Sequence, residues 1–268
     1  MNEYKSVGFS LVELMIALAI GLVVIASVLA FTMSSLNANT EYVQVTRLTQ
    51  ELRNTLDLAI NDVKRAGYNQ NSMKYVALPA GNTERSKFSP IYVDPGSDAD
   101  GDGIADNSCI IYAYDSSKVS TSSTTGPGFI DTASGEIKGL RHAIRTVAGQ
   151  SVGVIEIAQT TSGVSSLSCA GAAPDYDANY PVACSSGGWC PLSEPRQINV
   201  KGFTIAKVVD PGLPLTGNFG SQVRRLDFTL TGSLSSQPTI LRSVQSSLLV
   251  RADCLYLSLS ECNAVPTP

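Results

Sequence analysis

One carboxylate stands next to a long uncharged stretch near the start of this 268-residue chain. Glu13 directly precedes residues 14–33, LMIALAIGLVVIASVLAFTM, which carry no charge. A run of about 20 such residues matches the hydrocarbon core of a bilayer, so we expect it to span a membrane. An ionisable group beside hydrocarbon costs roughly 2.5–3.5 kcal/mol on insertion scales. Glu13 therefore indicates a function that needs its charge.

A short polar leader, MNEYKSVG, precedes the apolar run and ends at the junction of Gly8 and Phe9. A secretory signal has the opposite order, with its cleavage site after the apolar region. Cleavage between Gly8 and Phe9 would create an α-amino group four residues before Glu13, with an ordinary pKa of about 7.7–8.0. This cation would pair with Glu13 within one helix turn or in a neighbouring subunit. The alternative is a signal anchor in which Glu13 only reaches the membrane interface.

A second group of carboxylates has the spacing of a calcium loop. The carboxylates at its first, third, fifth and ninth positions are Asp98, Asp100, Asp102 and Asp106. Gly103 permits the sharp turn at the sixth position, and Ile104 offers its carbonyl at the seventh. Cys109 stands where an EF-hand has its glutamate, which favours a solitary extracellular calcium loop over a helix-loop-helix site. The alternative is a solvated acidic turn without metal.

The chain has six cysteines, an even number, beside a membrane-targeting segment, and this favours disulfides formed outside the cytoplasm. Cys254 and Cys262 are expected to close a small loop near the C-terminus. The pairing of the others stays open: Cys109, Cys169, Cys184 and Cys190. At least one bridge is expected among the last three of these. A zinc site is disfavoured because Cys184 and Cys190 lack a two-residue spacing and His142 is the only histidine.

Charge and composition argue against two function classes. The formal net charge is -4 with a pI of about 5.0, and the basic residues are scattered, so direct binding of nucleic acid is not expected. The sequence offers no set of catalytic partners for His142 and has no Gly-x-Ser-x-Gly nucleophile elbow. The chain is therefore not expected to be an enzyme, and no catalytic residue is assigned. Trp189 is either an exposed anchor for a partner or a shield for a disulfide.

The elements that carry these residues can be outlined from periodicity. An amphipathic helix after the membrane run is predicted by apolar residues at three- and four-residue steps: Leu48, Leu52, Leu56, Ile60 and Val63. Lys64, Arg65 and Gly67 suit the end of a helix, which is expected near Ala66. Beyond it, candidate strands cover residues 109–114, 152–158, 198–209, 225–230 and 240–250. Residues 116–128 and 162–195 are expected to form long loops.

These patterns predict an α+β fold, with a long N-terminal transmembrane and amphipathic helix packed on an antiparallel β-rich head. The expected organisation is a leader at residues 1–8, a membrane or filament-core helix at 9–36, an amphipathic helix at 37–66 and an extracytoplasmic head at 67–268. The alternating segment RLDFTL at 225–230 suits a sheet with one covered face, where the helix would lie.

The N-terminal residues Gly8-Phe9-Ser10-Leu11-Val12-Glu13-Leu14 resemble the class III signal of type IV prepilins and type II secretion pseudopilins. The resemblance implies that prepilin peptidase cuts after Gly8 and methylates the new amine of Phe9. It also implies that Glu13 neutralises the terminus of a neighbouring subunit during assembly.

Two further segments resemble PilW-type minor pilins: residues 62–68, DVKRAGY, and residues 249–254, LVRADC. The implied fold is pilin-like, and the implied function is a minor pilin that helps to initiate or cap a type IV pilus in adhesion, motility or DNA uptake. The implied partners are other minor and major pilins, prepilin peptidase and a tip adhesin. The chain would cross the inner membrane once with a periplasmic head, and would reach the cell surface in the pilus.

Two other functions remain open on the sequence. The first is a minor pseudopilin of a type II secretion system, for which the pseudopilin J subunit is the nearest competitor. The second is a membrane-tethered, calcium-dependent binding module that never polymerises. Cleavage at Gly8 separates the two filament proteins from the tethered module, and the identity of co-purifying partners separates a pilus from a secretion system.

Overall fold

The computed structural model describes residues 8, 10–72, 86–98, 105–116, 128–172, 176, 188–210, 214–215, 219–256 and 259–268. The chain divides into two compact units, Met1–Arg47 and Leu48–Pro268. One helix, α1 (Leu11–Val63), contributes residues to both units.

In the first unit, α1 is an apolar helix with exposed side chains. Its first turn closes where the backbone amide of Leu14 donates a hydrogen bond to the carbonyl of Ser10 at 3.2 Å. An 18-residue window has a mean hydropathy of 2.9 and none of it is buried, so the helix is long and apolar enough to cross a membrane. This single N-terminal helix suggests membrane anchoring.

In the second unit, α1 buries one stripe of side chains against the strands. Its fully or nearly buried residues are Leu48, Leu52, Thr55, Leu56, Ala59, Ile60 and Val63. Their three- and four-residue steps place them on one helix face. The helix ends at Val63, three residues before the expected position, because the amides of Arg65 and Ala66 bond to carbonyls three residues back and tighten the chain. Gly67 then adopts a φ of +80°, as its expected role at a helix end requires.

The first sheet is antiparallel with the strand order β1-β2-β3-β4-β5. Its strands are β1 (Ile91–Asp94), β2 (Cys109–Ala113), β3 (Ile137–Val147), β4 (Gln150–Gln159) and β5 (Cys190–Pro191). The long pair β3 and β4 is joined by a tight turn at Ala148 and Gly149, both with positive φ. A short 3-10 helix, η1 (Thr132–Ser134), precedes β3.

The second sheet is organised around β8 and is also antiparallel. Its strands are β6 (Ile198–Asp210), β7 (Pro214–Leu215), β8 (Phe219–Leu234), β9 (Gln237–Leu249) and β10 (Cys254–Tyr256). Residues 223–234 of β8 pair with β6, residues 225–234 also pair with β9, and residues 219–222 pair with β7 and β10. A second 3-10 helix, η2 (Leu259–Asn263), follows β10.

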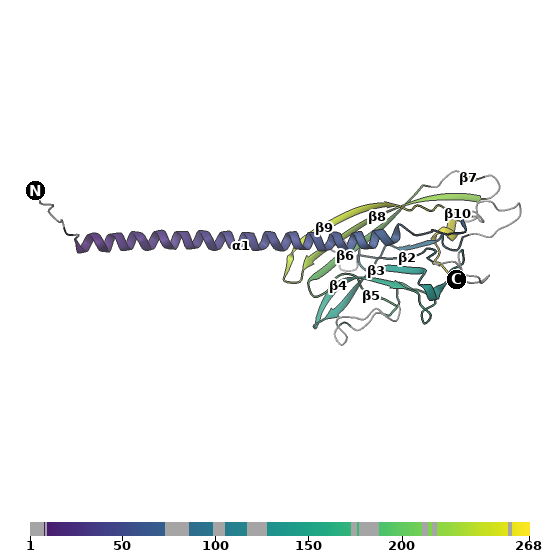
Figure 1. Cartoon of the computed structure of the whole chain (residues 1–268), viewed down its shortest axis with the longest axis horizontal. Coiled ribbons are helices and arrows are strands. Elements are labelled where there is room, and N and C mark those ends of the chain that lie inside the picture. The colour runs from purple at the N-terminus through teal and green to yellow at the C-terminus, as the bar shows by residue number, and fades with distance from the viewer. Residues whose placement is uncertain are drawn as a thin grey trace, which may run out of the picture. The chain divides into compact units, whose positions relative to one another are not determined.

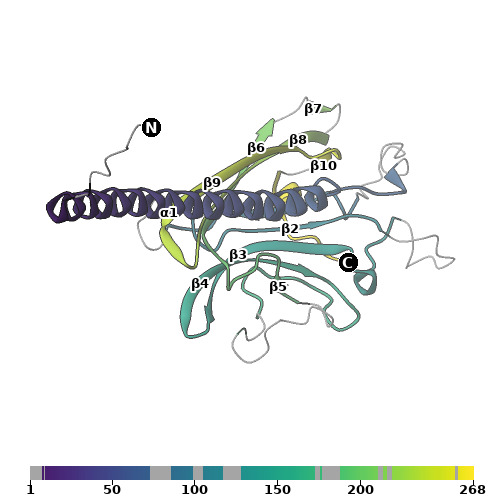
Figure 2. The same cartoon turned by 60° about the vertical axis from the view of Figure 1, so that its left-hand side comes forward.

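The main core joins the second-unit part of α1 to both sheets. It includes Leu52 and Ile60 from α1, Leu140 from β3, and Phe203 and Phe228 from the second sheet, whose rings stack at 5.9 Å. Figures 1 and 2 show this part of α1 beside β8 and β9 on one side and β2 and β3 on the other. The structure therefore confirms the predicted α+β fold with a long helix and antiparallel sheets.

Candidate functional site

The predicted processing and assembly residues lie at the start of α1. Gly8 and Ser10 are exposed, and Glu13 is an exposed acidic residue in the first turn of the helix. Phe9 lies outside the described residues. A carboxylate in a first turn interacts favourably with the unpaired amides at the helix start. Glu13 is flanked by the exposed apolar side chains of Val12 and Leu14, so its charge stands on an otherwise apolar surface.

Asp62 fastens the C-terminal turn of α1 to the first sheet. Its carboxylate accepts hydrogen bonds from the hydroxyls of Tyr112 at 2.5 Å and Tyr114 at 2.8 Å, and Lys138 lies 3.4 Å away. Burial first, and then the charge of Asp62, raise the pKa of Tyr112 well above its ordinary value, so its hydroxyl remains a donor. The amide of Gly67 donates to the carbonyl of Ala113 at 2.8 Å and adds a backbone link at the same place. These bonds fix the C-terminal end of the helix to β2 and to Tyr114, which follows it.

Only the base of the predicted calcium loop can be described. The backbones of Ser97 and Asp106 form two hydrogen bonds, at 3.0 and 2.9 Å, that close the loop. Asp106 is 4% exposed, and its carboxylate lies 3.8 Å from His142 Nδ1 in the head. Asp100, Asp102, Gly103 and Ile104 lie outside the described residues. Within the described part of the chain, no three metal-binding side chains come together. Calcium binding by Asp98, Asp106 and the residues between them stays a prediction.

His142 is a packing residue in the interior of the head. Its Nδ1 accepts a hydrogen bond from the backbone amide of Asn107 at 3.3 Å, and its Nε2 donates to the carbonyl of Val200 at 3.1 Å. These two partners require a neutral ring with its proton on Nε2. Burial is the main reason that the pKa of His142 is lowered. The side chain therefore connects β3 to β6 without carrying charge.

Disulfides join distant parts of the head. Cys254 and Cys262 are bonded, and they tie β10 to η2. Cys109 on β2 is bonded to Cys169, which lies in the loop after β4. Cys190 is also disulfide-bonded, and Cys184 lies outside the described residues.

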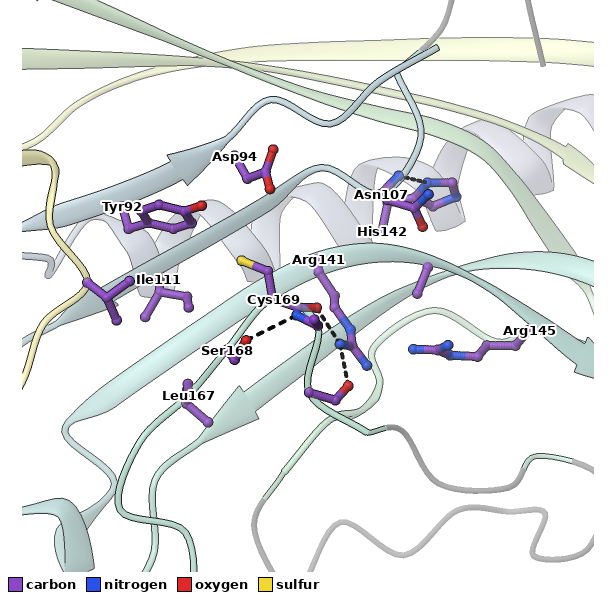
Figure 3. Close-up of a pocket in the computed structure, with 14 residues that line it drawn as sticks. Tyr92, Asp94, Asn107, Ile111, Arg141, His142, Arg145, Leu167, Ser168 and Cys169 are labelled. Carbon is purple, nitrogen blue, oxygen red and sulfur yellow. Dashed lines mark hydrogen bonds between the residues drawn. The ribbon is translucent and has the colours of Figure 1, made fainter. Parts of the chain in front are cut away.

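A hollow of about 560 Å³ opens beside the disulfide between Cys109 and Cys169. It lies between the strands β1, β2 and β3 and the loop at residues 167–171. Figure 3 shows Arg141 pointing from β3 toward this loop, with Arg145 beside it and the pair of Asn107 and His142 above them in the view. Arg141 Nη1 donates to the carbonyls of Cys169 and Gly171, each at 2.6 Å. One arginine therefore holds the loop that carries the disulfide.

Glu156 on β4 binds both arginines. Arg141 Nε lies 2.7 Å from Glu156 Oε2, and Arg145 Nε lies 2.7 Å from Oε1. The hydroxyl of Tyr176 donates to Oε1 at 2.9 Å. Burial of Glu156 would raise its pKa, but the hydrogen bonds and charges of Arg145 and Arg141 lower it below its ordinary value. The group is therefore an ionised, fully partnered carboxylate inside the protein.

Trp189 belongs to the same structural cluster. Its ring is 4% exposed, packs in a cluster with Cys109, and has the guanidinium of Arg141 4.1 Å from its centroid. A Cβ added at Gly139 would stand 2.7 Å from the ring, so the glycine leaves room for the indole. Of the two sequence interpretations of Trp189, an exposed anchor is wrong, and the ring covers the disulfide region.

One buried cation, Arg224, and one partly buried cation, Lys207, bind the C-terminal segment, and the sequence pattern identified neither. Arg224 on β8 donates to the carbonyl of Ser89 and, at 2.7 Å, to that of Ala252. Lys207 on β6 donates to the carbonyl of Ile91 at 3.2 Å and to the side chain of Asn263. Lys207 lies within the candidate strand at 198–209, and Arg224 lies just before the alternating segment at 225–230. A single charge at such a position does not indicate that its side chain points inward.

Comparison with known sequences places the chain among prepilin-related proteins. The sequence model of PpdB, prepilin peptidase-dependent protein B, matches residues 41–250. This match covers most of the head and lies outside the leader and the membrane run. It is thus independent of the residues around Gly8 and Glu13. Comparisons with curated proteins and with solved structures returned no match.

Proposed function

The chain belongs to the prepilin peptidase-dependent protein B family, and we propose that it is a minor pilin that helps to initiate or cap a type IV pilus. The observation that carries the proposal is the agreement of two separate parts of the chain. The head matches a family defined by its dependence on prepilin peptidase, and the residues before the membrane run have the prepilin spacing of Gly8, Phe9 and Glu13.

Prepilin peptidase is the first proposed partner. It cuts between Gly8 and Phe9 and methylates the amine of Phe9. The new terminus is a cation, and Glu13 is the carboxylate in the first turn of α1. In an apolar surrounding, an ion pair between subunits offsets the cost of both charges, and it selects the register in which a new helix joins the filament.

The proposed role requires a continuous helix whose C-terminal turn is firmly bonded to the head. α1 is unbroken between Leu11 and Val63 and contains no proline. At its last turn, Asp62 binds two tyrosines of β2 and the segment after it. The head is stabilised by disulfides, which form in the oxidising space outside the inner membrane. We propose a single-pass precursor with a periplasmic head that moves into the pilus at the cell surface.

The finer proposal is a PilW-type role, in which the subunit joins other minor pilins and a major pilin and presents its head, or a tip adhesin, at the filament end. Its function is structural, so no catalytic activity is proposed. Calcium at Asp98, Asp100, Asp102, Ile104 and Asp106 is proposed as an ordering ligand for the head. No observation favours a type II secretion pseudopilin over a pilus subunit.

Fractionation of cells tests the proposal. Filaments sheared from the surface should contain the protein in a small amount relative to the major pilin, and deletion of its gene should lower the number of filaments. A protein confined to the inner membrane in cells that make normal filaments would contradict it. Co-purification with secretion subunits, in place of pilins, would identify the pseudopilin alternative.

A further inference from the structure

Three exposed cations meet around a hollow at the C-terminal end of α1. Lys64 and Arg65 come from the turn that follows the helix, and Arg251 comes from the turn that follows β9. The hollow has a volume of about 680 Å³, and all of its lining residues belong to the second unit. It lies apart from the hollow of Figure 3, with which it shares no lining residue.

The fold fixes the distance between the two turns. The buried Arg224 donates to the carbonyl of Ala252 at 2.7 Å and so holds the turn that carries Arg251. A Cβ added at Gly67 would stand 2.8 Å from the Cβ of Ala252, so the two turns are in close contact. The packing of the head therefore brings Arg251 close to Lys64 and Arg65, although most of the head's sequence lies between them.

Among the described residues, the cations of this hollow outnumber the carboxylates. The described lining contains one carboxylate, Asp115, which is buried and accepts backbone hydrogen bonds from Gln70 at 3.1 Å and Gly128 at 2.8 Å. In the described part of the chain, none of the three cations forms a salt bridge with a carboxylate. Lys64 donates to the amide oxygen of Asn61 at 3.3 Å, and Arg65 lies over the ring of Tyr114 at 5.8 Å.

Two further carboxylates, Asp62 and Asp253, interact with residues other than these three cations. Asp62 binds Tyr112, Tyr114 and Lys138. Asp253 does not line the hollow, and its charge acts on the buried Arg224. Cations at the end of a helix also offset the helix dipole, which accounts for Lys64 and Arg65 in part. The helix dipole does not account for Arg251, which lies in the turn between β9 and β10.

An exposed aromatic side chain completes the surface. Tyr68 is 54% exposed and lines the same hollow. Tyrosine and arginine are enriched at the energetic centres of protein interfaces, because each combines a large contact area with a hydrogen-bonding group.

We propose that this hollow binds a carboxylate-bearing segment of a partner protein. An arginine fork matches a carboxylate in a bidentate arrangement, and Tyr68 supplies an apolar face beside it. A nucleic acid is the weaker fit, because the described lining holds three cations and the chain as a whole carries a formal charge of -4, which opposes a long polyanion. The proposal does not depend on cleavage at Gly8 or on polymerisation.

The experiment uses the full chain in a nonionic detergent and a fluorescent hexaglutamate peptide, with hexaglutamine as the uncharged control. Binding is measured by anisotropy at about 50 mM and about 500 mM salt, because interactions between exposed charges are screened over this range. The test variant is Lys64→Gln with Arg251→Gln. The matched control is Arg53→Gln with Arg242→Gln, which removes the same charge from exposed positions elsewhere on the second unit.

Hexaglutamate should bind more tightly than hexaglutamine, and less tightly at high salt. The test variant should weaken hexaglutamate binding about fivefold or more, and the control variant less than about twofold. Equal losses in both variants, or no difference between the two peptides, would overturn the proposal. Tighter binding of a single-stranded oligonucleotide than of hexaglutamate would replace the acidic protein segment by a nucleic acid.

Discussion

The hydroxyl of Tyr112 on β2 donates a hydrogen bond of 2.5 Å to Asp62 in the last complete turn of α1. Among the described residues, this is the shortest hydrogen bond between the helix and the first sheet. Tyr114 and Lys138 also bind the carboxylate of Asp62. Asp62→Ala would leave two tyrosine hydroxyls and one ammonium group without this acceptor. We expect a loss of about 1–3 kcal/mol in the free energy of unfolding, since the hydrogen bonds are partly buried and one partner is charged.

Thermal and urea unfolding of the full chain in detergent micelles measures this loss. Asp57→Ala is the matched control, because Asp57 is an exposed carboxylate on the same helix, one to two turns earlier. Equal unfolding midpoints for the two variants would show that Asp62 does not fasten α1 to the head.

Lys207 should make the stability of the head depend on pH in the alkaline range. Burial first, and then the charge of Arg224, lower its pKa to about 8 in the folded protein. The ordinary pKa of lysine is about 10.4, so between about pH 8 and pH 10.4 the unfolded chain binds more protons than the folded chain at this site. Stability rises with pH wherever the unfolded state binds more protons. The wild-type head should therefore gain stability relative to Lys207→Met as the pH rises through this window.

The quantity to measure is the difference in unfolding free energy between wild type and Lys207→Met at pH values from about 7 to about 10.5. Lys201→Met removes a lysine from the same strand and serves as the comparison. A difference that stays constant, or falls with pH, contradicts the partly buried placement of the Lys207 ammonium between the carbonyl of Ile91 and the side chain of Asn263.

The two described disulfides should contribute unequally to stability. Cys109 and Cys169 are 60 residues apart, whereas Cys254 and Cys262 are 8 apart. In the chain-entropy description, loops of these lengths correspond to roughly 4 and roughly 2.6 kcal/mol. Replacing both cysteines of the first pair by serine should destabilise the head more. The fluorescence of Trp189, the only tryptophan, reports the change directly because its ring packs in the cluster that contains Cys109. A larger loss from the second pair would contradict this order.

Much of the architecture could be predicted because it follows from periodicity. The stripe from Leu48 to Val63 has the helical step, and it is the stripe that is buried. The segment 225–230 alternates, and its inward residues Leu226, Phe228 and Leu230 pack in the same core as that stripe. In these places the apolar pattern alone decides which face is covered.

The strand β3 could not be predicted in this way. Its sequence, IKGLRHAIRTV, contains four basic or titratable side chains that interrupt any apolar run. Arg141 and His142 are nevertheless buried, because Glu156 on the neighbouring strand and the carbonyl of Val200 receive their donors. A pattern of single residues does not contain this information, since each buried polar side chain is hydrogen-bonded to a partner that is distant in sequence.

Glu13 should be dispensable for insertion and required for assembly. Glu13→Ala removes a costly charge from the apolar helix, so insertion into the membrane should be at least as efficient as in the wild type. The variant should be depleted from sheared filaments because the amine of a neighbouring subunit loses its partner. Ser27→Ala is the control, because the hydroxyl of Ser27 donates within its own helix, to the carbonyl of Val24 at 2.7 Å. Normal amounts of Glu13→Ala in filaments would rule out an intersubunit role.

Processing after Gly8 is tested most directly by the mass of the mature N-terminal peptide from membrane-resident protein, in cells with and without active prepilin peptidase. We expect a chain that begins at Phe9 with one added methyl group in the first cells, and a chain that retains residues 1–8 in the second. An intact Met1 in cells with active peptidase would contradict processing after Gly8, and with it the assignment of the chain as a pilus subunit.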